Sequence, residues 1–315
     1  MPLKVYSEIG RLRRVLLHRP GNEIDRMVPS MMEHLLFDDI LDGEEARQEH
    51  DTFRTLLERL GVETLDATVL LREALDAAPA ARAELLDSLQ GSHGVPDRVL
   101  ATLPKLSNEQ LVSALTAGVR DEEAARRGGP LFELLPLPNY FFQRDPTTVI
   151  GNRVVISSMA TEAREREPLL SRIAFGYHPS LGGYEDLFRL DRPPKFAPEF
   201  GAPSYAFPTI EGGDVLVASR ETLLVGISAR TNRRGVEILA EYLRREKTPF
   251  RHLIAVEMPP RRAFMHLDTV FTLVDHNLAI GYAPVLEPGW PETASVYRVD
   301  LDAAELTFTL QARRR

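Results

Sequence analysis

The sequence contains no cysteine among its 315 residues. Disulfide bonds, thiolate metal ligands and catalysis by a thiolate are therefore excluded within this chain. No apolar run approaches the roughly 20 residues needed to cross a bilayer, and the opening "MPLKVYSEIGRLRR" lacks the apolar centre of a signal peptide. We therefore expect a cytoplasmic protein with no membrane partner.

Basic residues are also outnumbered, with 38 Lys and Arg against 46 Asp and Glu and a formal net charge of -8. This balance argues against a general polyanion-binding role, so nucleic acid is not an expected partner. The remaining composition, 43% hydrophobic and 27% charged, is typical of a soluble globular protein with a sizeable core.

Three segments share one layout, namely residues 145–158, 211–228 and 266–282. Each has an acidic residue at its entrance, a short apolar strand, a polar turn and a second apolar strand. The segment "SEIGRLRRVLLHRPG" resembles a degraded copy with Glu8 at its entrance. These spacings indicate a repeat architecture.

A helix and a closing strand follow the hairpin in several copies. Residues 228–247 place Val236, Leu239 and Leu243 on one helical face, and the strand pattern of 250–258 comes next. Residues 43–61 form another helical pattern with an apolar stripe, ended by a glycine and followed by the strand "VETL". The predicted unit is therefore β-β-α-β.

The pattern changes to Ala- and Leu-rich helices over residues 68–128, where the sequence "SNEQ" predicts a capping box at a helix start. We interpret this segment as a helical insertion. The expected organisation is a first part of the repeated fold at 1–67, the insertion at 68–128 and the remainder at 129–315.

Units repeated around a common axis would bring every hairpin entrance to the centre. We therefore expect Asp145, Glu211, His266 and Asp268 to converge. Alternate residues of a strand face the same side, so His266 and Asp268 would also project together if strand geometry already holds at His266.

Three carboxylates and an imidazole in one pocket repel one another unless a cation lies among them or some of them are protonated, so the expected ligand is positive. A planar guanidinium suits such a pocket because its N–H groups match carboxylate geometry. Glu211 and His266 are candidates for a proton-transfer pair, a task worth about 100- to 10,000-fold in rate. Arg164 and Arg230 follow predicted hairpins and would hold the α-carboxylate of an amino-acid ligand.

The ordered motifs "HLLFDDIL", "LPNYFFQRDP", "EGGD", "SARTN" and "MHLDTVFT" resemble those of arginine deiminase, a member of the guanidino-group modifying superfamily. The resemblance covers essentially the whole chain. It implies a pseudo-fivefold α/β propeller of ββαβ units that hydrolyses L-arginine to L-citrulline and ammonia, with no metal and no organic cofactor.

The resemblance also implies roles for eight residues by position. Asp145 and Asp268 match guanidinium-binding aspartates, and Glu211 and His266 match the proton-transfer pair. Arg164 and Arg230 match the carboxylate-binding arginines. Asn139 and Phe142 match pocket-lining positions.

The chain departs from the family at the nucleophile. In the family, a cysteine near the C-terminus attacks the guanidinium carbon, and this cysteine and its Gly-rich segment have no counterpart here. The last repeat passes through residues 294–315 and ends without a helix and closing strand. We therefore expect a truncated chain that lacks its final blade and does not turn over arginine. Its exposed strand edges favour aggregation or pairing, so a homo-oligomer is one expected outcome.

Two other functions remain open from the residues. The chain would be a non-catalytic arginine-binding or regulatory protein if it kept the pocket without the nucleophile. Alternatively, the four converging acidic and imidazole side chains suit a hard metal ion used for hydrolysis. Taken alone, His266 and Asp268 are most simply a hydrogen-bonded pair at a strand end, and the two arginines are surface salt-bridge residues.

Overall fold

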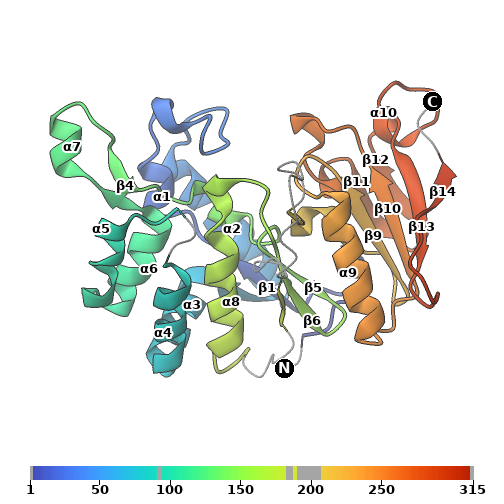
Figure 1. The fold of residues 1–315 in the computed structure, drawn as a ribbon, viewed down its shortest axis with the longest axis horizontal. Coiled ribbons are helices and arrows are strands. Elements are labelled where there is room, and N and C mark those ends of the chain that lie inside the picture. The colour runs from blue at the N-terminus through green and yellow to red at the C-terminus, as the bar shows by residue number, and fades with distance from the viewer. Residues whose placement is uncertain (1–2, 91–93, 182–186, 190–206, 313–315) are drawn as a thin grey trace, which may run out of the picture. The chain divides into compact units, whose positions relative to one another are not determined.

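The computed structural model describes residues 3–90, 94–181, 187–189 and 207–312 (Figure 1). The chain forms two units. The first contains residues 1–11, 144–160 and 186–315, and the second contains residues 12–143 and 161–185. Within the described ranges, no helix combines the length and apolar character needed to cross a membrane.

The first unit contains one complete β-β-α-β element. Strands β8 (Val215–Val217) and β9 (Thr222–Ile227) are antiparallel, and β10 (His252–Glu257) pairs parallel with β9. Helix α9 (Arg233–Arg245) makes the connection between β9 and β10, along the sheet in Figure 1. This order confirms the predicted unit for this part of the chain.

Helix α9 packs through the face that the sequence pattern predicts. Val236, Leu239 and Leu243 are buried in one apolar cluster with Val225 and Leu253 of the adjacent strands. The helix begins after Asn232, whose side chain accepts a hydrogen bond from the N–H of Gly235. Burial of this face is what fixes the helix on the sheet.

The same sheet continues beyond β10 with β13 (Ser295–Asp300) and β14 (Thr309–Ala312), both antiparallel to their neighbours. The preceding hairpin, β11 (Phe271–Asp275) and β12 (Leu278–Gly281), forms a separate two-stranded sheet. Only the short helix α10 (Ala283–Leu286) lies between β12 and β13. The last repeat therefore has its hairpin without a parallel closing strand in the described residues.

A second set of strands has the same pairing. Strands β5 (Thr147–Ile150) and β6 (Arg153–Ile156) are antiparallel, and β7 (Leu187–Arg189) is parallel to β6. The connection between β6 and β7 includes α8 (Glu167–Tyr177). Two hairpins predicted from the sequence thus lead into strands of matching topology.

The second unit begins with β1 (Arg14–Leu17), which pairs parallel with β2 (Glu63–Asp66). Helix α2 (Gly43–Arg59) lies between them in the chain and ends before Gly61, whose φ is +78°. The predicted glycine stop is confirmed. The predicted apolar stripe is not buried at Phe53 or Leu56, which remain about half exposed.

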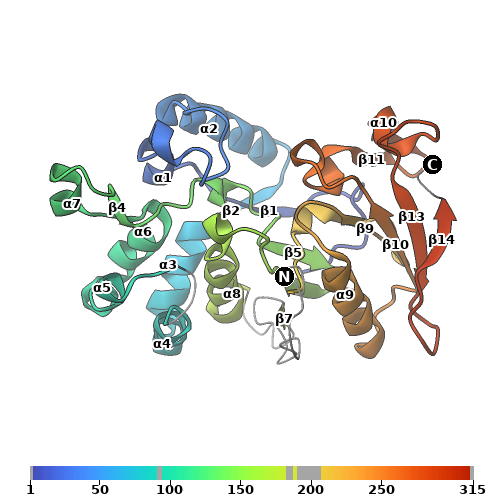
Figure 2. The ribbon, with the colours of Figure 1, turned by 45° about the horizontal axis from the view of Figure 1, so that its top comes forward.

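Helices dominate residues 67–126 of the second unit. Helix α3 (Ala67–Ala77) packs against α4, α6 and α8 (Figure 2). Ser107 and Gln110 form the predicted capping box at the start of α6. The other elements are α1 (Asn22–Asp25), α4 (Pro79–Ser88), α5 (Asp97–Leu100), α6 (Asn108–Ala117), α7 (Glu122–Arg126), β3 (Val119–Arg120) and β4 (Phe132–Leu134).

The fold is of the α/β class, as the sequence predicts. The described strands form one five-stranded, one three-stranded and three two-stranded sheets. The pseudo-fivefold propeller with a missing blade, and the three-part division at residues 67 and 128, stay predictions.

Candidate functional site

The first unit brings Glu211 and His266 into direct contact. Nε2 of His266 lies 2.8 Å from Oε2 of Glu211, and both side chains are buried. The other carboxylate oxygen of Glu211 accepts a hydrogen bond of 3.0 Å from the N–H of Ala160. Glu211 is therefore held at both oxygens, and it orients the imidazole ring.

Asp145 lies on the other side of the same ring. Its Oδ1 is 3.7 Å from Nδ1 of His266, and its side chain is also buried. Burial alone lowers the pKa of His266, but the hydrogen bond with Glu211 and the nearby carboxylates outweigh it and raise this pKa to about 8. The imidazole is therefore mostly protonated at neutral pH and can act as a general acid.

Two glycines allow these side chains to meet. Gly212 and Gly213 lie in the 3-10 helix η6 (Gly212–Asp214), directly before β8. A Cβ at Gly213 would lie 2.6 Å from Nδ1 of His266 and 3.0 Å from Oδ1 of Asp145. The glycines form a turn before a strand, and they also let the backbone approach the imidazole closely.

Asp268 is near this cluster but differs from the other members in exposure. Partial burial and the charges of Asp145 and Glu8 raise the pKa of the Asp268 carboxyl, whereas the positive charge of His266 opposes that rise. The residue as a whole is exposed, and its partly buried carboxyl group makes no hydrogen bond within the described residues. Asp268 is therefore open to a cation from solvent.

The backbone of His266 is extended, but no strand begins there, so the condition for His266 and Asp268 to project together is not met. Residues 267–269 form the 3-10 helix η8 (Leu267–Thr269), and β11 begins only afterwards. His266 is buried while Asp268 is exposed. A turn separates the two side chains because the N–H of Leu267 donates to Asp214, at 2.8 Å, instead of joining a strand ladder.

The ion pair of Arg144 and Glu8 supports the turn that carries Glu211. The guanidinium of Arg144 binds both oxygens of Glu8, at 2.8 and 3.1 Å. Its Nε also donates to the carbonyl of Gly212 at 3.0 Å. Arg144 directly precedes Asp145, and Gly212 directly follows Glu211. This one arginine therefore supports the backbone beside two predicted site residues.

Arg230 is half-buried and follows β9 in the first unit. Its backbone N–H donates to the hydroxyl of Ser228, at 3.0 Å, and Ser228 in turn contacts Asp214. Neither Asp214 nor Ser228 is among the residues predicted from the sequence. The signal for Asp214 was present, because it is the last residue of the "EGGD" motif.

The remaining predicted residues belong to the second unit. Arg164 is buried and binds both oxygens of Glu167, with its Nη2 2.8 Å from Oε2. Its guanidinium also lies 5.9 Å from the ring centroid of Phe142. Asn139 is buried and donates to the carbonyl of Leu35 at 2.8 Å. Nη2 of Arg164 also donates to the carbonyls of Asn139 and Phe142, each at 3.4 Å, so these three residues lie together, with Arg164 engaged by a carboxylate of its own unit.

Three of the clustered groups also have the chemistry of a metal site. One ligand atom from each of Asp145, Glu211 and His266 lies within 4.8 Å of the others. However, each imidazole nitrogen of His266 faces one of the two carboxylates, so the ring itself lies where a shared cation would bind. This arrangement suits a protonated histidine better than a bound metal ion.

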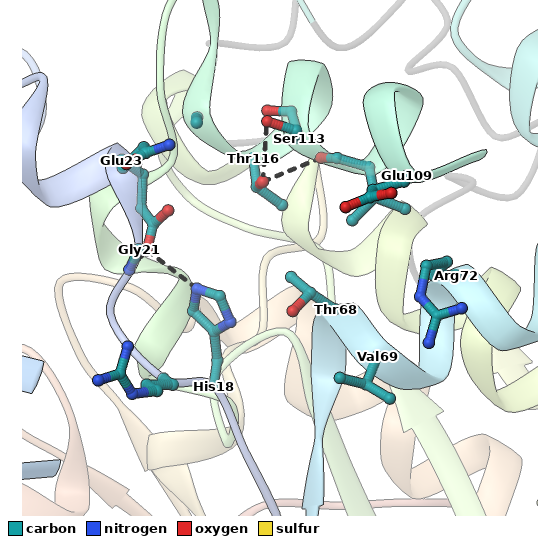
Figure 3. Close-up of a pocket in the computed structure, with 13 residues that line it drawn as sticks. His18, Gly21, Glu23, Thr68, Val69, Arg72, Glu109, Ser113 and Thr116 are labelled. Atoms are coloured by element: carbon teal, nitrogen blue, oxygen red, sulfur yellow. Dashed lines mark hydrogen bonds and ion pairs between the residues drawn. The ribbon is translucent and has the colours of Figure 1, made fainter. Parts of the chain in front are cut away.

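A cavity of about 270 Å³ in the second unit is lined partly by His18 and Glu23 (Figure 3). Nε2 of His18 is 3.0 Å from Oε1 of Glu23, and both side chains are buried. The same glutamate oxygen accepts the N–H of Gly21 at 2.5 Å. None of the predicted site residues lines this cavity, and we assign it no part in guanidinium chemistry.

Comparison with known proteins identifies the family. Residues 33–307 match the family model described as arginine deiminase. The chain belongs to the arginine deiminase family. An arginine deiminase of Staphylococcus aureus (strain MRSA252) is 36% identical over 301 residues, which cover 91% of this chain and 70% of that protein. An arginine deiminase of Clostridium perfringens (strain SM101 / Type A) is 36% identical over 317 residues, covering 95% and 73%.

Solved structures are more distant than these relatives of the arginine deiminase family. A dimethylarginine dimethylaminohydrolase adduct with 4-chloro-2-hydroxymethylpyridine has 15% identity and a TM-score of 0.46, covering 88% of this chain and 72% of that one. An amidinotransferase of saxitoxin biosynthesis from Microseira wollei has 16% identity and a TM-score of 0.45, covering 87% and 67%. The family assignment depends on the sequence matches alone.

Proposed function

We propose that this chain supplies the guanidinium-binding and proton-transfer groups of an arginine deiminase, which converts L-arginine and water to L-citrulline and ammonia. The observation that carries the proposal is the buried His266 held between Glu211 and Asp145, at 2.8 and 3.7 Å, in a chain of this family. A protonated imidazole at this place has a clear task, because the leaving amine of a guanidinium must gain a proton.

The proposed chemistry has two steps. A thiolate attacks the guanidinium carbon, and His266 donates its proton to the amino group, which leaves as ammonia. The neutral imidazole then takes a proton from water as that water attacks the same carbon, citrulline is released and the thiolate is regenerated. Glu211 stabilises the imidazolium through its charge and holds the ring in place by its hydrogen bond with Nε2.

Substrate recognition is assigned to two sets of residues. Asp145 and the exposed Asp268 would accept hydrogen bonds from the guanidinium, as carboxylates do in paired geometry. Arg230 and Arg164 would bind the α-carboxylate, and Asn139 and Phe142 would line the pocket. For Arg164 this role requires part of its guanidinium to leave Glu167, which now binds it at both oxygens.

The thiolate is not among the 315 residues, because the sequence has no cysteine. We therefore propose that this chain alone binds arginine without turning it over. The same absence favours a second candidate function, a non-catalytic arginine-binding or regulatory protein. If a thiol attacks arginine bound at this site, that thiol must come from outside these residues.

Two measurements on the purified chain test the proposal. Calorimetry with L-arginine should give one binding site per chain, and an ammonia assay with the same protein should give no product above a protein-free control. A folded chain that binds no arginine contradicts both candidate functions. Release of ammonia and citrulline in equal amounts would show that a residue other than cysteine acts as the nucleophile.

The metal alternative is tested on protein purified without chelator. The proposal expects no stoichiometric metal by elemental analysis and expects arginine affinity to be unchanged by added chelator. One tightly bound divalent ion per chain, whose removal abolishes arginine binding, would support a metal-dependent hydrolase instead.

A further inference from the structure

Asp214 is a fully buried carboxyl group that the proposed chemistry leaves without a task. Its Oδ1 accepts a hydrogen bond of 2.8 Å from the backbone N–H of Leu267. Its Oδ2 lies 2.7 Å from the hydroxyl oxygen of Ser228. Leu267 directly follows His266, and Ser228 lies two residues before Arg230. One carboxyl group therefore touches the segments that carry two predicted site residues.

The hydroxyl oxygen of Ser228 has a second short oxygen contact. It lies 2.7 Å from the carbonyl oxygen of Met265, which is the residue before His266. It also accepts backbone N–H groups from Arg230 and Thr231, at 3.0 and 3.2 Å. Met265 is thus hydrogen-bonded to Ser228 directly, and Leu267 is joined to Ser228 through Asp214. Both neighbours of His266 are therefore connected to the loop that carries Arg230.

The two short contacts of Ser228 require two hydrogen atoms. A separation of 2.7 Å between oxygens is the usual length of an O–H···O bond. The carbonyl of Met265 can only accept, and an ionised Asp214 can only accept, whereas the serine hydroxyl has a single hydrogen to donate. If the serine donates to Met265, the hydrogen in the other contact must come from the aspartate.

We infer that Asp214 is held as a neutral carboxylic acid and acts as a positioning residue of the arginine site. Its role in that site rests on the proposed function, whereas its protonation does not. In this arrangement Asp214 donates through Oδ2 to one lone pair of Ser228, the N–H groups of Arg230 and Thr231 share the other, and Ser228 donates to the carbonyl of Met265. Leu267 donates to Oδ1 of Asp214 and completes a clamp around His266.

The surroundings of Asp214 agree with a neutral acid. Burial raises its pKa to about 7, although the positive charge of His266 and hydrogen bonds from Thr231 and Leu267 oppose the rise. A Cβ at Gly226 would overlap the carboxyl group, so β9 closes the space beside it. The charged groups that face His266, and so influence this balance, are Glu211, Asp145 and Asp268.

Carbon-13 NMR of side-chain carboxyl groups tests the protonation directly. The resonance of Asp214, assigned by its loss in D214N, should titrate with a midpoint near pH 7. D302N provides the matched control, because Asp302 is exposed in the same unit and its removal should leave the Asp214 titration unchanged. A midpoint of Asp214 near pH 4 would overturn the inference.

The positioning role is tested by arginine affinity in a set of three variants. D214A removes the hydrogen bonds of Asp214 to Leu267 and Ser228, and S228A removes the hydroxyl that joins Asp214 to Met265. Each variant should therefore weaken arginine binding at least tenfold. D214N should restore affinity to within about threefold of the native chain, because an amide can donate to Ser228 and accept from Leu267. Equal losses in D214A and D214N would contradict a neutral acid.

One outcome separates this inference from the proposed function. If the native chain does not bind arginine, the proposed function fails, while the carboxyl titration still decides whether Asp214 is neutral. If D214A does not fold, S228A and D214N keep the positioning role testable. Unchanged affinity in S228A, together with unchanged ring resonances of His266, would overturn that role.

Discussion

Nε2 of His266 lies 2.8 Å from Oε2 of Glu211, with both side chains buried in the first unit. The hydrogen bond favours the protonated imidazole, which is why burial does not lower the pKa of His266 below its ordinary value. The contact joins two turns that are 55 residues apart in the chain.

Glutamine at position 211 should lower the pKa of His266. E211Q keeps a side chain of the same size but removes the negative charge that stabilises the imidazolium, so the pKa should fall from about 8 towards its ordinary value of 6.5. Proton NMR of the imidazole ring across this range measures the shift. E305Q changes an exposed glutamate of the same unit and should leave the titration where it is. An unchanged midpoint in E211Q would refute the assigned interaction.

Alanine at position 213 should displace the imidazole. A Cβ there would lie 2.6 Å from Nδ1 of His266, and such overpacking costs on the order of 1–3 kcal/mol. Urea unfolding should show this loss, together with changed His266 resonances. G10A is the matched control, since a Cβ at Gly10 would meet only Ser7 at 3.8 Å. Equal stability of G213A and the native chain would contradict the close packing described here.

The stability contribution of His266 should decrease as pH rises. Its pKa is higher in the folded chain than the ordinary 6.5, so the folded state binds this proton more tightly. The contribution is fully present below about pH 6.5 and is lost as pH rises through about 8, a change of about 2 kcal/mol. Urea unfolding at intervals from pH 6 to 9 should therefore show native and H266Q converging.

A matched variant controls that pH series. His276 is exposed in the turn between β11 and β12, so H276Q should follow the native chain throughout. If H266Q also follows the native chain with a constant difference at every pH, the folded state does not hold this proton more tightly.

The buried ion pair of Arg164 and Glu167 should stabilise the second unit against unfolding. E167Q leaves the guanidinium of Arg164 without its paired carboxylate, and breaking a buried pair in this way costs about 3–5 kcal/mol. Thermal unfolding measures the loss. E162Q, at an exposed glutamate of the same segment, should unfold like the native chain. If E167Q is as stable as E162Q, the pair contributes little.

Much of the fold was accessible from sequence patterns. The inward face of α9, the capping box at Ser107 and the glycine after α2 each follow from local chemistry, and the structure confirms all three. The entrances of the repeated hairpins also predicted that Asp145, Glu211, His266 and Asp268 converge, and ligand atoms of the first three lie within 4.8 Å of one another in the first unit.

Other features depend on contacts that local patterns do not contain. A turn at Leu267 precedes β11, and the N–H of Leu267 donates to Asp214, which lies 53 residues earlier in the chain. The partner of Arg164 was missed although Glu167 is only three residues away. Alternating apolar residues show which face of an element is buried, but they do not show which buried acid accepts which donor.

The central claim is that carboxylates of this site gather around the flat cation of arginine, and calorimetry on D268N tests it most directly. The native chain should bind L-arginine at least tenfold more tightly than L-citrulline, which lacks the positive charge, because charge-assisted hydrogen bonds contribute about 1.5–3 kcal/mol. D268N should lose most of this preference, whereas D275N, at an exposed aspartate of β11, should keep it. Equal affinity for arginine and citrulline in the native chain, or an unchanged preference in D268N, would contradict the account.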